Sequence, residues 1–357
     1  MKAVKNRIVF DQEYYEKIMD EFGYNPLEFE KINFSLANLT EDDLQRRWLC
    51  HQDCDIFADG IKKYEKAIVS TGFGLTGIPH VGTLSQIIRA IILQKAGIPV
   101  NMVLGDLDAY NGKGKSLSKT MELVDKYKEF VISLGFDSTP PSILRSQFNE
   151  LDALRTSYLI GHYMDDEMFQ KTEEDLHDFY SQHGKVDKDM SYRRKLSLNL
   201  MTADFIHLNT KIGFNHVLVM LGIDEHKYVQ FGKETVNRMK KDENLKNFDM
   251  SLSGLYSPMI KGFYNYPKMS KSFPESGITV DMDFHEIKKK IMEGEGIYDK
   301  PENNVVYQMM ASVSLLTSDE LKNNYEACFE RDDDWEKAKK NYAETLFDIC
   351  SKWKGLK

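Results

Sequence analysis

The stretch "KAIVSTGFGLTGIPHVGTLSQIIRAIILQKAGIPVNMVLGDLDA" (residues 66–109) contains the pattern that decides the fold. It begins with a short apolar run that ends in glycines. A segment with apolar residues at three-to-four spacing follows, and a second short apolar run begins after Gly97. These periods predict a strand, a helix and a strand. Strands joined in this way are parallel with a right-handed crossover, so the sequence predicts an open parallel sheet.

Three later apolar runs extend this prediction along the chain. "PSILRS", "HVLVMLGID" and "GLYSPMIKG" read as further strands with helical segments between them. We expect a Rossmann-like α/β domain over residues 67–282, with a helical insertion around 150–210. A helical N-terminal extension is expected over residues 1–66, with Thr40 as a helix N-cap. A helical C-terminal domain is expected over residues 283–357.

Charge and composition limit the classes of function. The chain has 357 residues, with 56 acidic and 47 basic side chains and a net charge of −9. This balance argues against a protein that coats nucleic acid through bulk positive charge, although it allows local basic patches at residues 193–195 and 240–241. The sequence shows neither a signal-peptide pattern nor a membrane span, so we expect a cytoplasmic protein without membrane contact.

The four cysteines raise the question of a metal site. Cys50 and Cys54 are four residues apart with His51 between them, which is half of a zinc-site pattern. No second close cysteine or histidine pair completes it, so we expect reduced, partly buried thiols and no bound metal.

The glycine-rich turn "GLTGIPHVGTL" (residues 74–84) joins the first predicted strand to its helix. Ligands of open parallel sheets bind beyond the carboxyl ends of the strands, and a helix N-terminus favours phosphate. Gly72, Gly74 and Gly82 would let a nucleotide approach the backbone, and His80 could donate to a phosphoryl oxygen. The alternative is that the glycines only shape a tight turn and that His80 caps the helix.

A second polar segment, "PKMSKSFPES", follows the last predicted strand. Its ammonium groups, Lys268 and Lys271, and its hydroxyls, Ser270 and Ser272, suit a polyphosphate on which charge develops. The alternative is an ordinary exposed basic loop.

Together, "PHVG" (79–82) and "KMSKS" (268–272) resemble the two signatures of class I aminoacyl-tRNA synthetases. Thr83 replaces the final histidine of the first signature, so only His80 receives its phosphate role. "TGIPHVG", "LMTADFIHLNT" (200–210) and "GIDEHKYVQFGKETVNRM" are similar to segments of the subclass that activates tryptophan and tyrosine.

The resemblance implies a full set of site residues. The catalytic residues would be His80, Lys268, Ser270 and Lys271. ATP would contact Gly72, Gly74, Gly82, Gly222, Asp224, Met259, Ile260 and Ser272. The amino acid would contact Ser70, Met201, Asp204 and Glu225, unless Asp204 only makes a helix-face salt bridge. Mg²⁺ would accompany ATP through its phosphate oxygens.

The implied activity is formation of an aminoacyl adenylate from ATP and an aromatic amino acid, with tryptophan favoured and tyrosine as the alternative, followed by transfer to tRNA. A homodimer is implied by analogy. Several departures keep other interpretations open, because Glu225 stands where the subclass has glutamine, Ser70 where some relatives have tyrosine, and Asp108 where several have histidine.

One alternative is a paralogue that passes the activated amino acid to another acceptor. A non-enzymatic RNA-binding protein or regulator and a nucleotidylyltransferase are weaker alternatives. The region after the second signature spans 85 residues, and its aromatic residues Trp335, Tyr342 and Trp353 would either stack on single-stranded RNA or pack between helices. Packing is the expectation.

Overall fold

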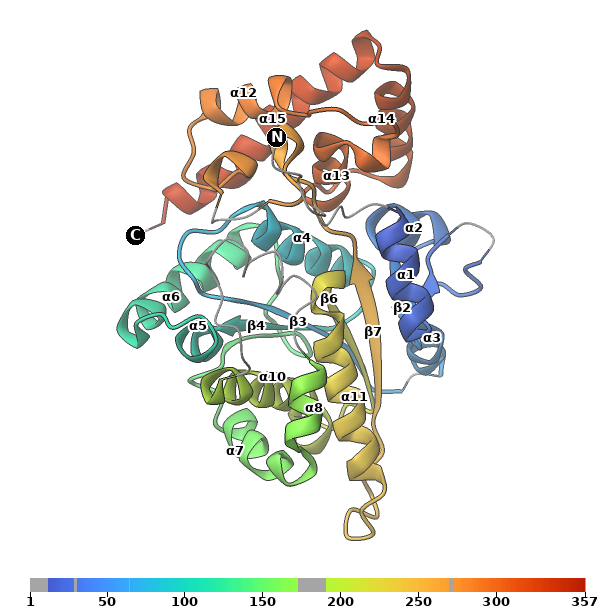
Figure 1. Cartoon of the computed structure of the whole chain (residues 1–357), viewed down its shortest axis with the longest axis vertical. Helices are drawn as coiled ribbons and strands as arrows, with labels where there is room; N and C mark the ends of the chain where they lie inside the picture. Colours follow the sequence, from blue (N-terminus) through green and yellow to red (C-terminus); the bar gives the residue numbers. More distant parts are fainter. Residues whose placement is uncertain (1–11, 29–30, 64, 173–190, 270–272, 357) are drawn as a thin grey trace, which may run out of the picture.

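A mixed seven-stranded sheet forms the centre of the molecule (Figure 1). The computed structural model describes residues 12–28, 31–63, 65–172, 191–269 and 273–356. Its strands are β1 (Asn25–Pro26), β2 (Cys50–Gln52), β3 (Ala67–Gly74), β4 (Val100–Gly105), β5 (Ile143–Ser146), β6 (His216–Gly222) and β7 (Ser251–Ser257). The spatial order is β1-β2-β7-β6-β3-β4-β5.

The five strands from β7 to β5 are parallel, which confirms the Rossmann-like α/β prediction. The chain runs outward from β3 to β4 and β5, and then returns to the other side of β3 for β6 and β7. The strand order therefore reverses between β3 and β6. Such a switch point opens a crevice at the carboxyl ends of the strands.

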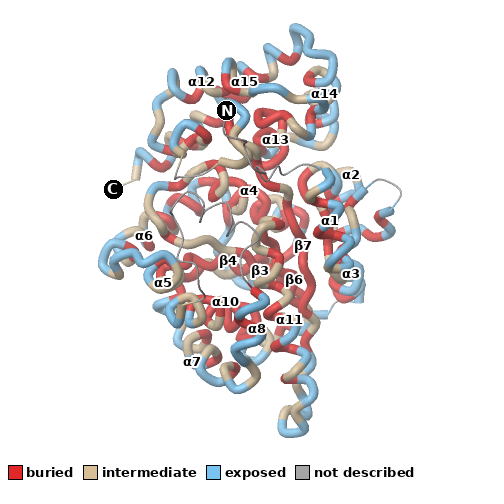
Figure 2. Tube along the Cα trace, viewed as in Figure 1, coloured by how far each residue is buried: buried red, intermediate tan, exposed pale blue. Residues whose placement is uncertain are grey.

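Helices cover both faces of this sheet. Those around the parallel strands are α4 (Val81–Lys95), α5 (Asp106–Asn111), α6 (Leu117–Ser133), α7 (Leu151–Ile160), α8 (Asp166–Lys171), α10 (Tyr192–Thr210) and α11 (His226–Lys240). Alternate side chains of β6 serve the two faces. Leu218 and Met220 belong to the core under α4, whereas Val217 and Val219 belong to the core under α10 and α11. Figure 2 shows buried residues concentrated along these strands.

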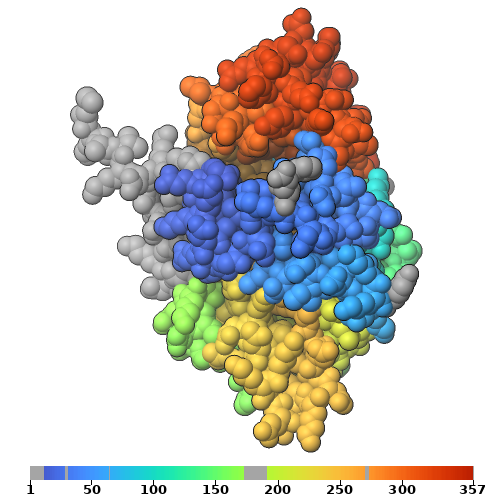
Figure 3. Space-filling view, turned by 90° about the vertical axis from the view of Figure 1, so that its right-hand side faces the viewer, coloured from blue at the N-terminus to red at the C-terminus, as the bar shows by residue number. Residues whose placement is uncertain are grey.

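The N-terminal segment is only partly helical, which corrects the expectation. It contains α1 (Gln12–Phe22), α2 (Glu41–Arg47) and α3 (Cys54–Lys62). Thr40 caps α2 as predicted, in a reciprocal pair with Asp43. Between α2 and α3, β2 pairs antiparallel with β7 and thereby protects the edge of the sheet. Figure 3 shows this segment, in blue, between the C-terminal helices and the α11 region.

The C-terminal region is helical in its described part. Its helices are α12 (Phe284–Glu293), α13 (Val305–Ser312), α14 (Ser318–Glu330) and α15 (Asp333–Lys354). Trp335, Tyr342 and Trp353 are buried, and the Trp353 ring packs edge-on against Tyr127 and Phe130 of α6. These aromatic residues therefore pack between helices, as expected, and offer no exposed platform for RNA bases.

No described helix has the length and apolar character needed to cross a bilayer.

Candidate active site

A cavity of about 120 Å³ opens at the carboxyl ends of β3, β4 and β6, where the strand order reverses. Its walls come from these strands, α5, much of α10, the turn after β6 and the start of α11. The lining residues are Thr71, Gly72, Phe73, Gly74, Val103, Gly105, Asp108, Gly112, Lys113, Gln147, Arg194, Ser197, Leu198, Met201, Asp204, Phe205, Leu221, Glu225 and Tyr228. The fold therefore brings together Gly72 and Gly74, which were predicted to contact ATP, and Met201, Asp204 and Glu225, which were predicted to contact the amino acid, although they are far apart in the chain.

His80 forms the N-cap of α4, as the alternative interpretation of the glycine-rich turn predicted. Its Nδ1 accepts a hydrogen bond from the backbone N–H of Thr83 at 3.3 Å. A neutral imidazole that accepts at Nδ1 carries its proton on Nε2. The cap therefore orients the ring and places the imidazole proton on the other nitrogen, so capping and a donor role toward phosphate are compatible.

The backbone brings the two signature segments together. The N–H of Val81 donates to the carbonyl of Ile278 at 3.0 Å, and the N–H of Val280 donates to the carbonyl of Pro79 at 3.1 Å. Lys268, the first residue of the second signature, lies 3.4 Å from Asp224 in the turn after β6. The predicted residues Ser270, Lys271 and Ser272 lie outside the described residues.

The predicted glycines make room for neighbouring protein groups. A Cβ on Gly72 would lie 2.6 Å from the carbonyl oxygen of Val103, and one on Gly82 would lie 2.6 Å from the imidazole of His80. A Cβ on Gly222 would lie 2.5 Å from the Asp224 carboxylate, and one on Gly74 would lie 2.8 Å from that of Asp108. A direct role of these glycines at a nucleotide stays a prediction.

The backbone beside the predicted adenine site is engaged in contacts of its own. The N–H of Met259 donates to the hydroxyl of Tyr15 in α1 at 3.1 Å, and the carbonyl of Ile260 accepts from the N–H of Met269 at 3.2 Å. The N-terminal segment therefore reaches the place where the nucleotide base is predicted to bind.

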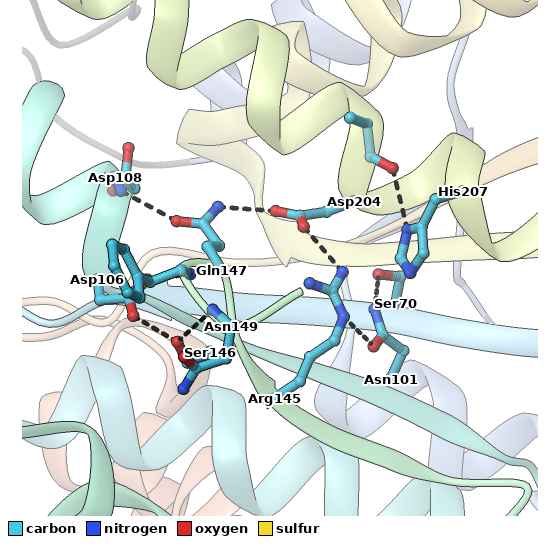
Figure 4. A network of polar contacts seen from close by, with 12 residues as sticks. Ser70, Asn101, Asp106, Asp108, Arg145, Ser146, Gln147, Asn149, Asp204 and His207 are labelled. Carbon is cyan, nitrogen blue, oxygen red and sulfur yellow. Dashed lines mark hydrogen bonds and ion pairs between the residues drawn. The ribbon is translucent and has the colours of Figure 1, made fainter. Parts of the chain in front are cut away.

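The floor of the cavity is a network of polar side chains around Asp204 (Figure 4). Arg145 Nη2 donates to Asp204 Oδ1 at 2.8 Å, and Gln147 Nε2 donates to Oδ2 at 2.7 Å. Asp204, Arg145 and Gln147 are all buried. Burial raises the pKa of Asp204, while the charge of Arg145 and the hydrogen bond from Gln147 act in the opposite direction.

The alternative prediction for Asp204 was a salt bridge on a helix face. Asp204 does form a salt bridge, with Arg145, but the pair is buried and Asp204 lines the cavity. Arg145 and Gln147 were not identified from the sequence. The available signal was the polar run "RSQ" at the end of a short predicted strand, where a sheet places its ligand-binding groups.

Ser70 lies behind the cavity and not on its surface, which corrects its predicted place in the pocket. Its hydroxyl accepts from Asn101 Nδ2 at 3.0 Å, and Asn101 in turn accepts from Arg145 Nε at 3.2 Å. The reason is its position on β3, one residue before Thr71, where the cavity lining begins. Ser70 thus supports the floor through two other side chains.

The other wall of the cavity is acidic and is also held in place. The N–H of Asp108 donates to Gln147 Oε1 at 3.0 Å, and Ser197 Oγ donates to the Asp108 carboxylate. Glu225 lines the same cavity at the start of α11. Two carboxylates that line one cavity provide a suitable environment for an ammonium group.

All four cysteines are buried and unpaired. Cys50 lies in β2 and Cys54 begins α3, so the two thiols do not lie on one helical turn. Within the part of the chain that the structure describes, no three acidic, histidine or cysteine side chains are grouped so that they could hold a metal ion.

The family model for class I tRNA synthetases (W and Y) matches residues 62–350, which is most of the chain. The chain belongs to this family. It is therefore a tRNA synthetase of the class that charges tRNA with tryptophan or tyrosine, and ATP use follows from the class. Both signature segments and every cavity-lining residue lie within the matched range.

Individual relatives of this synthetase are distant. The tryptophan–tRNA ligase of Methanocaldococcus jannaschii is 24% identical over 88% of this chain and 84% of its own length. The tyrosine–tRNA ligase of Methanobrevibacter smithii is 27% identical over 70% of this chain and 72% of its own length. The crystal structure of tryptophanyl-tRNA synthetase from Aeropyrum pernix shares the fold, with a TM-score of 0.77, 20% identity and coverage of 96% of this chain and 93% of that one.

Proposed function

We propose that this synthetase activates tryptophan with ATP and transfers it to tRNA. The observation that carries the proposal is the cavity floor, where Asp204 offers a fixed hydrogen-bond acceptor at the end of a pocket lined by Phe73, Met201 and Phe205. An indole ring has one N–H donor on an otherwise apolar body. The ligases named for tryptophan among its relatives support the same substrate.

The nucleotide end would act by positioning and charge stabilisation. The amino acid carboxylate attacks the α-phosphorus of ATP and pyrophosphate leaves, so no covalent enzyme intermediate is needed. His80 would donate from Nε2 to the phosphates. Lys268 and Lys271 would neutralise the leaving pyrophosphate, and the hydroxyls of Ser270 and Ser272 would add donors.

The remaining predicted contacts hold the two substrates in line. Asp224 and the backbone of Gly222 would bind the ribose, and the backbone beside Met259 and Ile260 would meet the adenine. Glu225 and Asp108 would receive the α-ammonium group of the amino acid. Mg²⁺ would arrive with ATP, bound through its phosphate oxygens, to balance their charge.

The tRNA end must reach the mouth of this cavity, and the basic residues there fit a phosphate backbone. Lys113 and Arg194 line the cavity, and Arg193 lies beside Gly114, where a Cβ would meet its guanidinium at 3.5 Å. Tyr192 is 74% exposed next to them. Basic groups beside an exposed aromatic ring suit a single-stranded RNA end.

A homodimer is part of the proposal, and α7 offers a face for it. Leu151, Tyr158 and Leu159 are exposed by 59%, 88% and 64% on this one helix. A two-fold symmetric dimer would bury the same apolar face twice. We expect L159E to shift the chain from dimer to monomer in light scattering, whereas I297E, at a still more exposed apolar residue of the C-terminal region, should leave the dimer intact. A wild-type monomer would contradict the proposal.

The decisive experiment measures ATP–pyrophosphate exchange with each of the twenty amino acids, and then transfer to total tRNA. Exchange with tryptophan and charging of its tRNA are expected. Exchange with tyrosine alone would replace the substrate, and no exchange with any amino acid would reject the activation step. The location in the cytoplasm stays a prediction from the sequence.

A second candidate function is transfer of the activated amino acid to another acceptor. The composition of the C-terminal region favours it, because residues 283–357 contain 16 acidic and 12 basic side chains. In the same region, Trp335, Tyr342 and Trp353 are buried. Such a surface is poorly suited to an RNA loop. Exchange with tryptophan but no charging of any tRNA would select this candidate.

A further inference from the structure

We propose that Arg145 sets the amino-acid specificity of this site, because it converts the carboxylate of Asp204 into a charge-neutral hydrogen-bond acceptor for an uncharged side chain with an N–H or O–H donor. This inference rests on the proposed function for its substrate. Arg145 touches no reacting atom, so it is a positioning residue. It is neither part of a signature motif nor a cavity-lining residue.

Arg145 lies on the side of Asp204 that faces away from the cavity. Asp204 lines the cavity, whereas Arg145 lies behind it and approaches one oxygen at 2.8 Å (Figure 4). On its far side, Arg145 Nε donates to Asn101 Oδ1 at 3.2 Å. A ligand in the cavity would therefore meet the oxygens of Asp204 while the balancing charge stays buried behind them.

Other titratable groups near Asp204 do not supply this charge. Asp106 is itself acidic, and it raises the pKa of Asp204. Burial and the charge of Arg145 lower the pKa of His207, one helical turn along α10, to about 4, so that imidazole is neutral at pH 7. Among the described residues, Arg145 makes the only ion pair with Asp204.

The floor retains acceptor capacity toward the cavity. An ionised carboxylate accepts about four hydrogen bonds, and the two donated by Arg145 and Gln147 use one site on each oxygen. The amide of Gln147 is fixed as well, because its oxygen accepts from the N–H of Asp108 at 3.0 Å. A neutral donor fits this surface, whereas a ring without a donor leaves the buried acceptor unpaired.

Structure alone gives Arg145 a weak reason to be charged. Its third guanidinium nitrogen, Nη1, is buried without a hydrogen-bond partner among the described residues. A buried ion pair adds little stability compared with apolar side chains of the same volume, and an unpaired buried donor is a further cost. The charge is therefore better explained by the ligand surface that it creates.

The test compares R145M, R145K and the double variant R145M/D204N, with R238M as the matched control at an exposed ion pair on α11. The probes are tryptophan and its isostere in which sulfur replaces the indole N–H. Binding is measured by calorimetry without ATP, and activation by pyrophosphate exchange between pH 6 and 8. Circular dichroism and melting temperature check that each variant folds.

The wild type should prefer tryptophan over the sulfur isostere by about 100-fold or more. In R145M, tryptophan binding should weaken about tenfold and become dependent on pH, recovering as the pH rises, because the uncompensated Asp204 binds a proton. R145K keeps the charge but loses one of the two bonds to Asp204 and Asn101, so its tryptophan binding should weaken less than that of R145M while its preference over the isostere is retained. The double variant should lose the pH dependence and bind tryptophan more tightly than R145M.

Unchanged tryptophan binding and unchanged preference over the isostere in R145M would overturn the inference. Equal weakening in R145M and in the double variant, with flat pH profiles, would also overturn it, because that result describes a purely structural residue. If R145M does not fold, R145K decides the outcome. Loss of the preference for tryptophan over the sulfur isostere in R145K would overturn the inference, because the charge is still present. A retained preference would support it. Normal binding without pyrophosphate exchange would reject the proposed function and leave this inference standing, whereas a wild type that binds neither probe would reject both.

Discussion

The nucleotide end of the site is formed mainly by backbone contacts, whereas the amino-acid end is formed by side chains. The nucleotide end consists of backbone and short contiguous segments, where residues 79–81 pair with residues 278–280 and His80 caps its own helix. The amino-acid end consists of side chains from β3, β4, β5 and α10 that meet in one buried network. The difference suggests that the first end fixes the reaction, which the whole class shares, while the second fixes the substrate. The following changes test this division.

The largest effect is expected at the nucleotide end. K271A should slow adenylate formation by about 100- to 1,000-fold, since it removes a charge that acts on the developing pyrophosphate. Tryptophan affinity should change little, because the amino-acid end is untouched. Single-turnover kinetics with a separate binding measurement checks both parts. A rate close to that of the wild type would remove Lys271 from the mechanism and weaken the division between the two ends.

The next largest effect concerns the stability of the amino-acid end at low pH. His207 is buried with a pKa lowered to about 4, whereas an exposed or unfolded histidine has a pKa of 6.5. Between these values the unfolded chain binds a proton that the folded chain does not, so the free energy of unfolding falls as the pH drops from 6.5 to 4. The histidine contributes up to about 3 kcal/mol to this fall.

Chemical denaturation of the wild type and H207Q at pH 7 and at pH 4.5 measures this contribution. The stability advantage of the wild type should shrink at the lower pH, and other acid-sensitive groups cancel in the comparison. If the free energies of unfolding of the two proteins changed equally with pH, the His207 imidazole would not be buried in its neutral form.

A smaller effect is expected from G82A. The new Cβ would lie 2.6 Å from the His80 ring and would displace it from the helix cap. Alanine favours a helix over glycine by about 1 kcal/mol, which offsets the loss of the cap, so stability should change little. The exchange rate should fall about tenfold through loss of an oriented donor. The double variant G82A/H80A should be no slower than H80A alone, and additive losses would show that Gly82 acts independently of His80.

The smallest effect is expected from Y15F. It leaves the N–H of Met259 without its acceptor, which should lower stability by about 1 kcal/mol. If adenine takes the same N–H, the loss of a competitor should lower the KM for ATP a few-fold. An unchanged or higher KM for ATP would place the adenine elsewhere and would show that α1 only packs against this segment.

Much of this protein could be predicted from its sequence. The parallel sheet, the glycine turn with His80 and the loop that begins at Lys268 are each encoded within a few consecutive residues, because backbone geometry and helix capping are local properties. For the same reason, the cap at Thr40 could be predicted. Local patterns failed where an edge strand was needed. Residues 50–52 form β2 because β7 lies beside them, and nothing within the segment itself specifies that neighbour.

The sequence by itself determined the α/β class of the fold and the position of the signature segments, and the family resemblance predicted an acceptor at Asp204. Only the tertiary structure decided how the charge of that carboxylate is balanced, since Arg145 in β5 reaches it from 59 residues away along the chain. It also moved Ser70 from the pocket to the layer behind it. The physical reason is that ion pairs and buried hydrogen bonds depend on distance in space, which the order of residues along a chain does not record.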